Sequence, residues 1–221
     1  MNTTKPPSQK ALAHMQAFRV WTEEERETSL QHTLSQRDEL KDIWIFAYGS
    51  LIWRPEFEFV EERRATLLGY SRALCLWSSM YRGTPENPGL VFGLTEGGLC
   101  EGKVYRLPNH NLLEQFRALW KREMPSDSYI ASWIKCETPQ GPATALAFVM
   151  DQNSHAYAGD LSEEETLDIV LNASGSVGTC FEYVIETQNA LHRAEIKDEY
   201  LDELSAIIQH RLEHKHLPLN E

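Results

Sequence analysis

The stretch FAYGSLIW, residues 46–53, has the pattern of a buried strand that ends in a glycine turn. Apolar residues precede the turn and resume directly after it, so both flanks are expected in the core. A serine nucleophile on such a turn requires glycine two positions before and two positions after it. Tyr48 and Ile52 occupy those positions around Ser50. We therefore interpret the turn either as a ligand cradle, in which Gly49 permits close approach to backbone N–H groups, or as a simple strand end.

Composition and charge limit the possible partners. The chain has 221 residues, of which 42% are hydrophobic, enough for one sizeable core. Its net charge of −12 argues against nucleic acid and anionic membrane surfaces as main partners. No apolar run approaches the roughly 20 residues that cross a bilayer, and residues 1–15 lack the apolar core of a secretory signal. The four cysteines form no CxxC pair. We expect a reduced, cytoplasmic protein, and the oligomeric state stays open.

Two parts of different character divide the chain. Residues 1–42 are polar, and the capping-box spacing of Thr22 and Glu25 predicts a helical N-terminal extension. Residues 43–221 are expected to form the main domain. Strands are predicted over 43–47 and 66–77, and hairpins are predicted over 91–107, turning at Gly97-Gly98, and over 129–149. Helices over 109–123, 181–197 and 198–214 complete an α+β pattern.

The helix predicted over 109–123 carries one carboxylate on its apolar face. Its apolar stripe consists of Leu112, Leu113, Phe116, Leu119 and Trp120. The next position on that stripe is Glu123, and the following Met124-Pro125 should end the helix there. Burial and the negative end of the helix dipole would both raise the pKa of this carboxyl, which suits a general base. The alternative is a structural carboxylate that is paired with the adjacent Arg122.

Three other motifs are weaker. The loop RGTPENPG, residues 82–89, either presents Arg82 rigidly or is an ordinary surface loop. The stretch NASGSVGT, residues 172–179, is similar to an anion-binding loop but lacks the glycine spacing of nucleotide sites. No carboxylate or cysteine completes a convincing set of metal ligands with His210, His214 and His216, which we interpret as part of a solvated helix end. We therefore expect no metal and no nucleotide cofactor.

The order of the motifs is more specific than any one of them. They are IFAYGSLIW at 45–53, RGTP and PG within 82–89, VYRLP at 104–108, WKREM at 120–124, and NASG, GT and EY within 172–183. Over residues 43–191 this order resembles the ChaC family, whose members are glutathione-specific γ-glutamylcyclotransferases. The resemblance implies a compact mixed β-barrel of the γ-glutamylcyclotransferase-like type packed with helices, and it implies no cofactor.

The resemblance also implies site residues. Carried over by motif, the cradle for the γ-glutamyl group consists of Ile45, Phe46, Ala47, Tyr48, Gly49, Ser50 and Leu51. Glu123 would be the catalytic acid and base. Arg82 is expected to bind the carboxylate of the cysteinyl-glycine half, with Tyr183 lining the site. The sequence departs from the family pattern at Ala47, Leu90 and Cys180, where the family has glycine, arginine and asparagine, and these changes leave the substrate preference open.

In the implied reaction the α-amine of glutathione attacks its own γ-carbonyl, which forms 5-oxoproline and releases Cys-Gly. The reaction needs a folded substrate and one carboxylate that moves a proton, and it needs no enzyme nucleophile. N–H groups after Tyr48 would bind the substrate carboxylate or the developing oxyanion, with Ser50 as a positioning contact. Two alternatives stay open: cyclisation of another γ-glutamyl amide, and a regulatory binding protein on the same scaffold, for example in ion transport. The turn together with Glu123 favours an enzyme.

Overall fold

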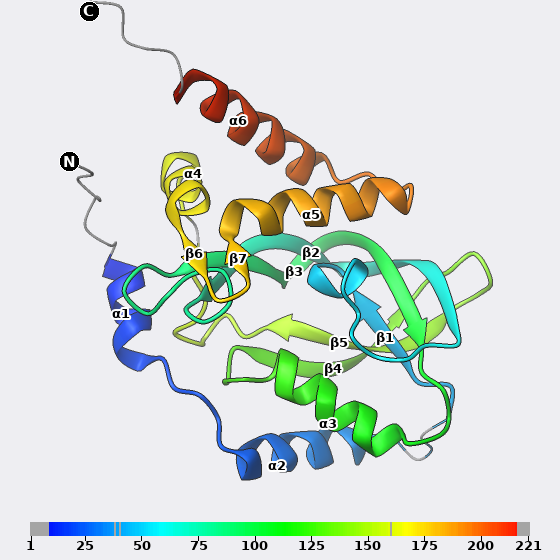
Figure 1. The fold of residues 1–221 in the computed structure, drawn as a ribbon. Coiled ribbons are helices and arrows are strands. Elements are labelled where there is room, and N and C mark those ends of the chain that lie inside the picture. The colour runs from blue at the N-terminus through cyan, green and yellow to red at the C-terminus, as the bar shows by residue number, and fades with distance from the viewer. Residues whose placement is uncertain (1–8, 38, 40, 160, 216–221) are drawn as a thin grey trace, which may run out of the picture.

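A computed structural model describes residues 9–37, 39, 41–159 and 161–215. Its centre is a curled five-stranded sheet in the order β2-β3-β1-β5-β4 (Figure 1). The strands are β1 (Trp44–Ala47), β2 (Glu61–Ser78), β3 (Gly89–Arg106), β4 (Tyr129–Cys136) and β5 (Ala143–Met150). The sheet is mixed, because β1 runs antiparallel to β3 and parallel to β5.

The two edge strands of the sheet meet at one end. Thr66 of β2 and Glu137, directly after β4, exchange both backbone hydrogen bonds, at 2.8 and 2.9 Å. The sheet therefore curls into a half-barrel rather than lying open. With the helices around it, this is the α+β fold that the sequence indicates.

The hairpin predicted around Gly97-Gly98 is wrong. Residues 91–94 and 104–106 belong to the two halves of β3, which pairs antiparallel with β2 from Arg106 to Gly89. Gly97 and Gly98 have positive φ angles of 100° and 74°, and they lie where the register of β2 shifts between Leu68 and Tyr70. The glycines therefore bend one long strand instead of reversing it. The second predicted hairpin is confirmed, since β4 and β5 pair antiparallel.

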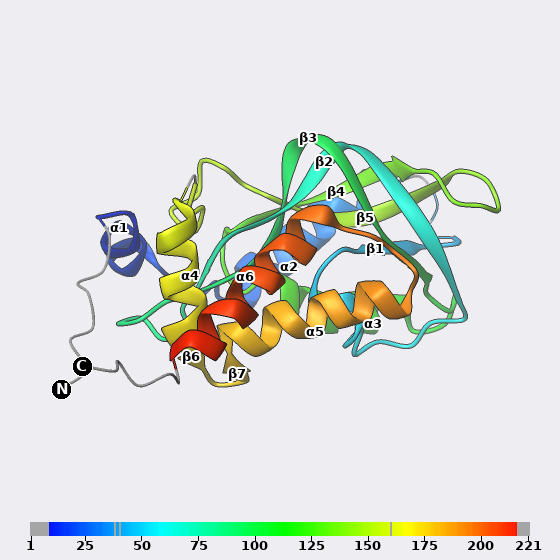
Figure 2. The same ribbon diagram turned by 90° about the horizontal axis from the view of Figure 1, so that it is seen from above.

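Helices cover both faces of the sheet. They are α1 (Gln9–Ala17), α2 (Glu23–Leu34), α3 (Leu112–Glu123), α4 (Glu163–Asn172), α5 (Cys180–Arg193) and α6 (Glu199–Lys215). In Figure 1, α4 to α6 lie above the sheet and α2 and α3 lie below it; Figure 2 shows α6 folding back along α5. The predicted capping box at Thr22 is present, and Ser162 and Thr179 cap α4 and α5 in the same way.

The two N-terminal helices pack against the rest of the chain. Glu27 on α2 pairs with Arg117 on α3 at 2.9 Å, and the indole of Trp133 on β4 donates to the carbonyl of Thr33 at 2.9 Å. The division at residue 42 stays a prediction, and residues 1–8 and His216 lie outside the described residues. Within the described ranges no helix is both long and apolar enough to cross a membrane.

Candidate active site

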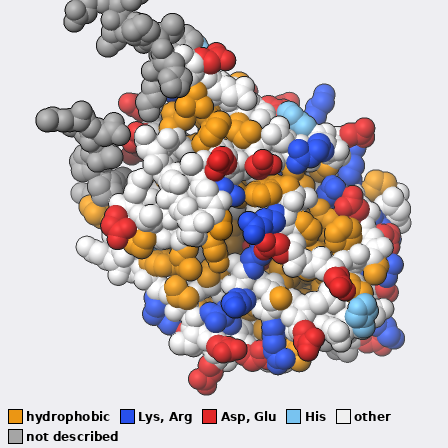
Figure 3. Space-filling view, in the orientation of Figure 1, with side chains coloured by type: hydrophobic (Ala, Val, Ile, Leu, Met, Phe, Trp, Pro, Cys, Tyr) orange, Lys and Arg blue, Asp and Glu red, His pale blue; other side chains and the backbone are white. Residues whose placement is uncertain are grey.

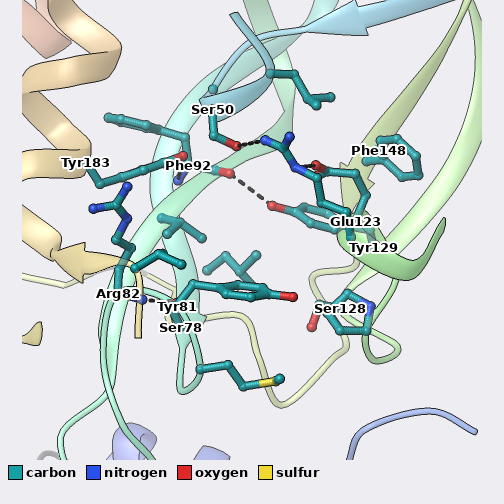
Figure 4. Close-up of a pocket in the computed structure, with 18 of the residues that line it drawn as sticks. Ser50, Ser78, Tyr81, Arg82, Phe92, Glu123, Ser128, Tyr129, Phe148 and Tyr183 are labelled. Atoms are coloured by element: carbon teal, nitrogen blue, oxygen red, sulfur yellow. Dashed lines mark hydrogen bonds and ion pairs between the residues drawn. The ribbon is translucent and has the colours of Figure 1, made fainter. Parts of the chain in front are cut away.

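A cavity of about 400 Å³ lies beside the turn that follows β1. Its walls come from this turn, the end of α3, the loop after β2, the start of β4 and α5. Figure 4 shows Glu123 and Ser50 on one side of it, and Arg82 with Tyr183 on another. On the face seen in Figure 3, basic and acidic side chains gather over apolar ones at the centre.

The turn after β1 is present as the sequence indicates. Glycine is required at position 49, however, because of packing and not because of an unusual backbone angle. The N–H of Ile52 donates to the carbonyl of Gly49 at 3.0 Å, so the N–H groups of Ser50 and Leu51 precede the first bond of the turn. Gly49 has a φ of −132°, so no positive φ requires glycine. A Cβ at Gly49 would instead lie 3.0 Å from the hydroxyl oxygen of Tyr183. Close packing against α5 therefore selects glycine here.

A buried arginine supports the turn from the core side. The Nε of Arg72 donates to the carbonyl of Tyr48 at 2.6 Å, and its guanidinium also contacts Asp198 and the carbonyl of Glu101. The hydroxyl of Tyr48 donates to the carbonyl of Phe148 at 2.7 Å. The turn is therefore tied to β2, β3, β5 and the start of α6, which makes its backbone a rigid wall of the cavity.

Glu123 is the last residue of α3, as predicted. Its side chain is 14% exposed, and its carboxylate oxygen lies 2.8 Å from the Nε of Arg122. Burial raises the pKa of the Glu123 carboxyl above its ordinary value, although the charge and the hydrogen bond of Arg122 oppose that rise. The sequence offered two interpretations of Glu123, a buried carboxylate and a carboxylate paired with Arg122. The structure shows both, because Glu123 pairs with Arg122 and also lines the cavity as a desolvated carboxylate.

Arg122 links this carboxylate to the turn, which the sequence did not indicate. Its Nη2 donates to the hydroxyl oxygen of Ser50 at 3.1 Å, and its Nη1 donates to the carboxylate of Glu56 at 3.0 Å. The Ser50 oxygen therefore faces a cation. No histidine occurs among the described residues that line the cavity, so Ser50 lacks the usual base of a serine nucleophile.

Arg82 and Tyr183 meet on the opposite side. The Arg82 guanidinium lies 5.5 Å from the ring centre of Tyr183 and donates to the carbonyl of Thr179 at 3.2 Å. Within the described part of the chain, no carboxylate lies within ion-pair distance of this guanidinium. The loop that carries Arg82 is tight, because a Cβ at Gly83 would lie 2.1 Å from the backbone nitrogen of Gly89. A buried cation on a rigid loop is suited to an anionic ligand group.

Comparison with known proteins shows the family to which the chain belongs. The sequence model described as ChaC-like protein matches residues 43–211. The chain is 36% identical to the glutathione-specific γ-glutamylcyclotransferase of Escherichia coli, over 84% of this chain and 80% of that protein. The chain belongs to the ChaC-like family.

Two further likenesses agree with that assignment. A glutathione-specific γ-glutamylcyclotransferase of Rattus norvegicus is 30% identical over 72% of this chain and 75% of the relative. The crystal structure of a glutathione-specific γ-glutamyl cyclotransferase from yeast superposes with a TM-score of 0.73 at 21% identity, covering 79% of this chain and 99% of the yeast chain. The structural likeness concerns the fold, and it supports the predicted γ-glutamylcyclotransferase-like class.

Part of the predicted cradle of this ChaC-like protein does not reach the cavity. Tyr48, Gly49, Ser50 and Leu51 line it, whereas Ile45, Phe46 and Ala47 do not. These last three residues belong to β1 and are at most 1% exposed, because β1 lies between β3 and β5 and is buried on both of its faces. The sequence pattern runs through strand and turn without a break, so it could not separate the supporting strand from the lining turn.

Two departures from the family pattern touch each other in this ChaC-like protein. The thiol of Cys180 donates to the carbonyl of Leu90 at 3.0 Å, and both residues are fully buried. Neither residue lines the cavity. The pair packs α5 against β3.

Aromatic side chains complete the site of this ChaC-like protein, and sequence reasoning missed them. The hydroxyl of Tyr129 donates to the carbonyl of Phe92 at 3.1 Å, and the Tyr81 ring points across the cavity toward Ser128 (Figure 4). Tyr81 adjoins Arg82, and Tyr129 starts a predicted strand six residues after Glu123. Closeness in sequence to a predicted site residue was the signal that could have indicated Tyr81 and Tyr129 as site residues.

Proposed function

We propose that this ChaC-like protein is a glutathione-specific γ-glutamylcyclotransferase, a lyase that converts glutathione to 5-oxoproline and Cys-Gly. The observation that carries the proposal is the desolvated carboxylate of Glu123 in the wall of the cavity, beside the turn at residues 48–51. The names of the relatives in Escherichia coli and Rattus norvegicus support the substrate.

Glu123 acts as both base and acid in the proposed mechanism. It takes a proton from the α-ammonium group of glutathione, and the freed amine attacks the γ-carbonyl carbon. The new carbon–nitrogen bond closes a five-membered ring, and the bond to the cysteine nitrogen breaks. Glu123 then returns its proton to that nitrogen, and the second proton of the attacking nitrogen passes through the freed carboxylate to the released amine, which leaves as the ammonium form of Cys-Gly. The reaction consumes no water, oxidant or cofactor. Burial suits Glu123 to this task because it brings the pKa of the carboxyl closer to neutrality.

The rest of the wall holds the γ-glutamyl group in its folded conformation. N–H groups of the turn bind the substrate carboxylate or the developing oxyanion, while Ser50 contributes a positioning contact. Arg122 keeps Glu123 and Ser50 in a constant relative position, because it bonds to both. Holding the amine next to the carbonyl supplies much of the acceleration, since the two reacting groups belong to one molecule.

Arg82 is proposed to bind the terminal carboxylate of glutathione, and Tyr183 to line the same region. Arg82 supplies the charge that the carboxylate needs, and within the described residues its guanidinium donates to the backbone carbonyl of Thr179. A carboxylate that approaches it would form charge-assisted hydrogen bonds. We also propose a cytoplasmic location, which fits the four cysteines because all are buried free thiols.

The test uses a substrate whose amine is blocked. Purified protein is incubated with glutathione and, separately, with glutathione acetylated on the γ-glutamyl α-amine, and 5-oxoproline and Cys-Gly are quantified. Cyclisation predicts equal amounts of both products from glutathione and no turnover of the acetylated substrate. Release of Cys-Gly from the acetylated substrate would contradict the mechanism. If the protein converts other γ-glutamyl amides but not glutathione, the proposal that glutathione is the substrate is contradicted.

A further inference from the structure

A segment outside the family match closes one end of the cavity. Residues 14–21, here called the strap, precede the matched residues 43–211. At one end of the strap, the Nε2 of His14 and the hydroxyl of Ser79 share a hydrogen bond of 2.8 Å. At the other end, the N–H of Trp21 donates to the carbonyl of Pro125 at 2.7 Å. The strap thus joins the loop after β2 to the segment that follows Glu123.

Phe18 lies between these two anchors and lines the cavity. Its N–H donates to the carbonyl of His14 at 2.8 Å, and the two rings lie 5.5 Å apart, centre to centre. His14 is 1% exposed, and its ring also stacks with Trp77 at 6.3 Å, centre to centre. A buried side chain therefore fixes the position of Phe18, so that Phe18 acts as a defined wall rather than a loose cover.

The cavity near the strap combines an apolar wall with buried hydroxyls. Trp77 and Phe18 supply the apolar surface. Ser126 and Ser128, both buried, lie 2.5 Å apart through their hydroxyl oxygens. One hydroxyl of such a pair donates to the other, which leaves one proton for a further acceptor. Apolar surface with a few hydroxyls matches the amide groups and short side chains of a small peptide.

The chemistry decides which part of the substrate faces this wall. Cyclisation requires the γ-glutamyl half to fold back on itself, with its amine against its γ-carbonyl, at Glu123 and the turn. That half is therefore compact. The part of the molecule that extends away from the reacting atoms is the departing amine, which for glutathione is Cys-Gly.

We propose that Phe18 sets the size limit for the amine that leaves the γ-glutamyl group. The inference rests on the proposed cyclotransferase function and adds a specificity-determining residue from outside the family match. With Phe18 in place, the strap closes the cavity around a dipeptide with a small side chain. With Phe18 shortened, the space of the ring becomes available to a larger group on the departing cysteine.

The experiment compares two substrates across matched variants. Values of kcat/KM are measured for glutathione and S-benzylglutathione with the wild-type protein, Phe18→Ala and Val20→Ala. Val20 belongs to the same strap but is 45% exposed and does not line the cavity. Ser79→Ala, which removes the hydroxyl that anchors His14, provides a second route to the same loosening. Circular dichroism and the thermal midpoint establish which variants are folded.

Phe18→Ala should raise the ratio of kcat/KM for S-benzylglutathione to that for glutathione by about tenfold or more, since even one methylene group in an apolar pocket changes discrimination by about 10- to 200-fold. Ser79→Ala should shift the ratio in the same direction, and Val20→Ala should leave it unchanged. A rise below threefold in both folded Phe18→Ala and Ser79→Ala would overturn the role of Phe18 while leaving the proposed function intact. If the wild-type protein converts neither glutathione nor S-benzylglutathione, both the proposed cyclotransferase function and the role of Phe18 are overturned.

Discussion

Replacing Glu123 by glutamine tests the proposed acid and base with a minimal change in shape. The amide keeps an oxygen that can accept the 2.8 Å contact from Arg122, so the local structure should persist. It cannot take up the ammonium proton, however. A positioned acid–base group contributes about 10²- to 10⁴-fold in rate, which corresponds to about 2.7–5.4 kcal/mol at about 1.36 kcal/mol per factor of ten. We expect kcat/KM for glutathione to fall by at least about a hundredfold.

A pH profile separates this role from a structural one. The base must be deprotonated, so kcat/KM of the wild-type protein should fall as the pH drops through the pKa of Glu123. Burial raises that pKa above its ordinary value of 4.5, so the acidic limb should lie above pH 4.5. The residual activity of Glu123→Gln should lack this limb.

The raised pKa also predicts a stability effect of defined sign. A carboxyl whose folded-state pKa exceeds its unfolded value contributes stability below the unfolded pKa and loses that contribution as the pH rises through the folded pKa. Glu123→Gln removes this titration. The variant should therefore gain free energy of unfolding relative to wild type as the pH increases from about 4 toward neutrality, measured by urea unfolding at several pH values.

Glu56 supplies the matched control because it is the other carboxylate among the described lining residues. Its side chain is 46% exposed and pairs with both Arg54 and Arg122, so it is solvated and doubly neutralised. Glu56→Gln should retain more than a tenth of wild-type kcat/KM. If a folded Glu123→Gln protein also keeps more than a tenth, or if Glu56→Gln causes the larger loss, the assignment of Glu123 is refuted.

Three further substitutions probe the rest of the wall. Arg82→Ala should lower kcat/KM for glutathione about 10- to 100-fold, the value of a charged hydrogen bond of about 1.5–3 kcal/mol, but should affect γ-glutamyl-alkylamides much less. Equal losses on both substrates would assign Arg82 to the fold or to the γ-glutamyl half. Ser50→Ala should raise KM about fivefold, since one neutral hydrogen bond contributes about 1 kcal/mol; complete inactivity of the folded variant would revive a nucleophilic serine. Gly49→Val should abolish binding, as measured by calorimetry with Glu123→Gln in the background, because a Cβ there already lies 3.0 Å from the Tyr183 hydroxyl. Normal affinity would contradict the close packing of the turn.

Much of the fold could be predicted from local patterns, and the error arose where a long-range strand pairing decides the structure. The apolar stripe of α3 and the following proline placed Glu123 correctly at the helix end. Gly97-Gly98 was misread because a glycine pair with positive φ serves both tight turns and strand bulges. The choice between them depends on pairing with β2, which begins some 35 residues earlier in the chain.

The site could be predicted only where its residues follow one another in sequence. The turn and Glu123 carry their own signals, whereas Arg122 gains its role from contacts with Ser50 and Glu56, 72 and 66 positions away in sequence. Phe18 is more remote still, because its place depends on anchors at Ser79 and Pro125. Such residues meet only when the half-barrel closes, so hydrophobic periodicity and motif spacing hold no information about them.

The origin of the oxygen in the product tests the central claim most directly. Glutathione is converted by the purified protein in water enriched in ¹⁸O, and the products are resolved by mass spectrometry. Intramolecular cyclisation predicts 5-oxoproline that carries no ¹⁸O, in equal amount to Cys-Gly, because the ring carbonyl keeps the oxygen of the substrate. Formation of glutamate labelled with ¹⁸O in its γ-carboxylate would show that water attacks the carbonyl, and would contradict cyclisation at Glu123.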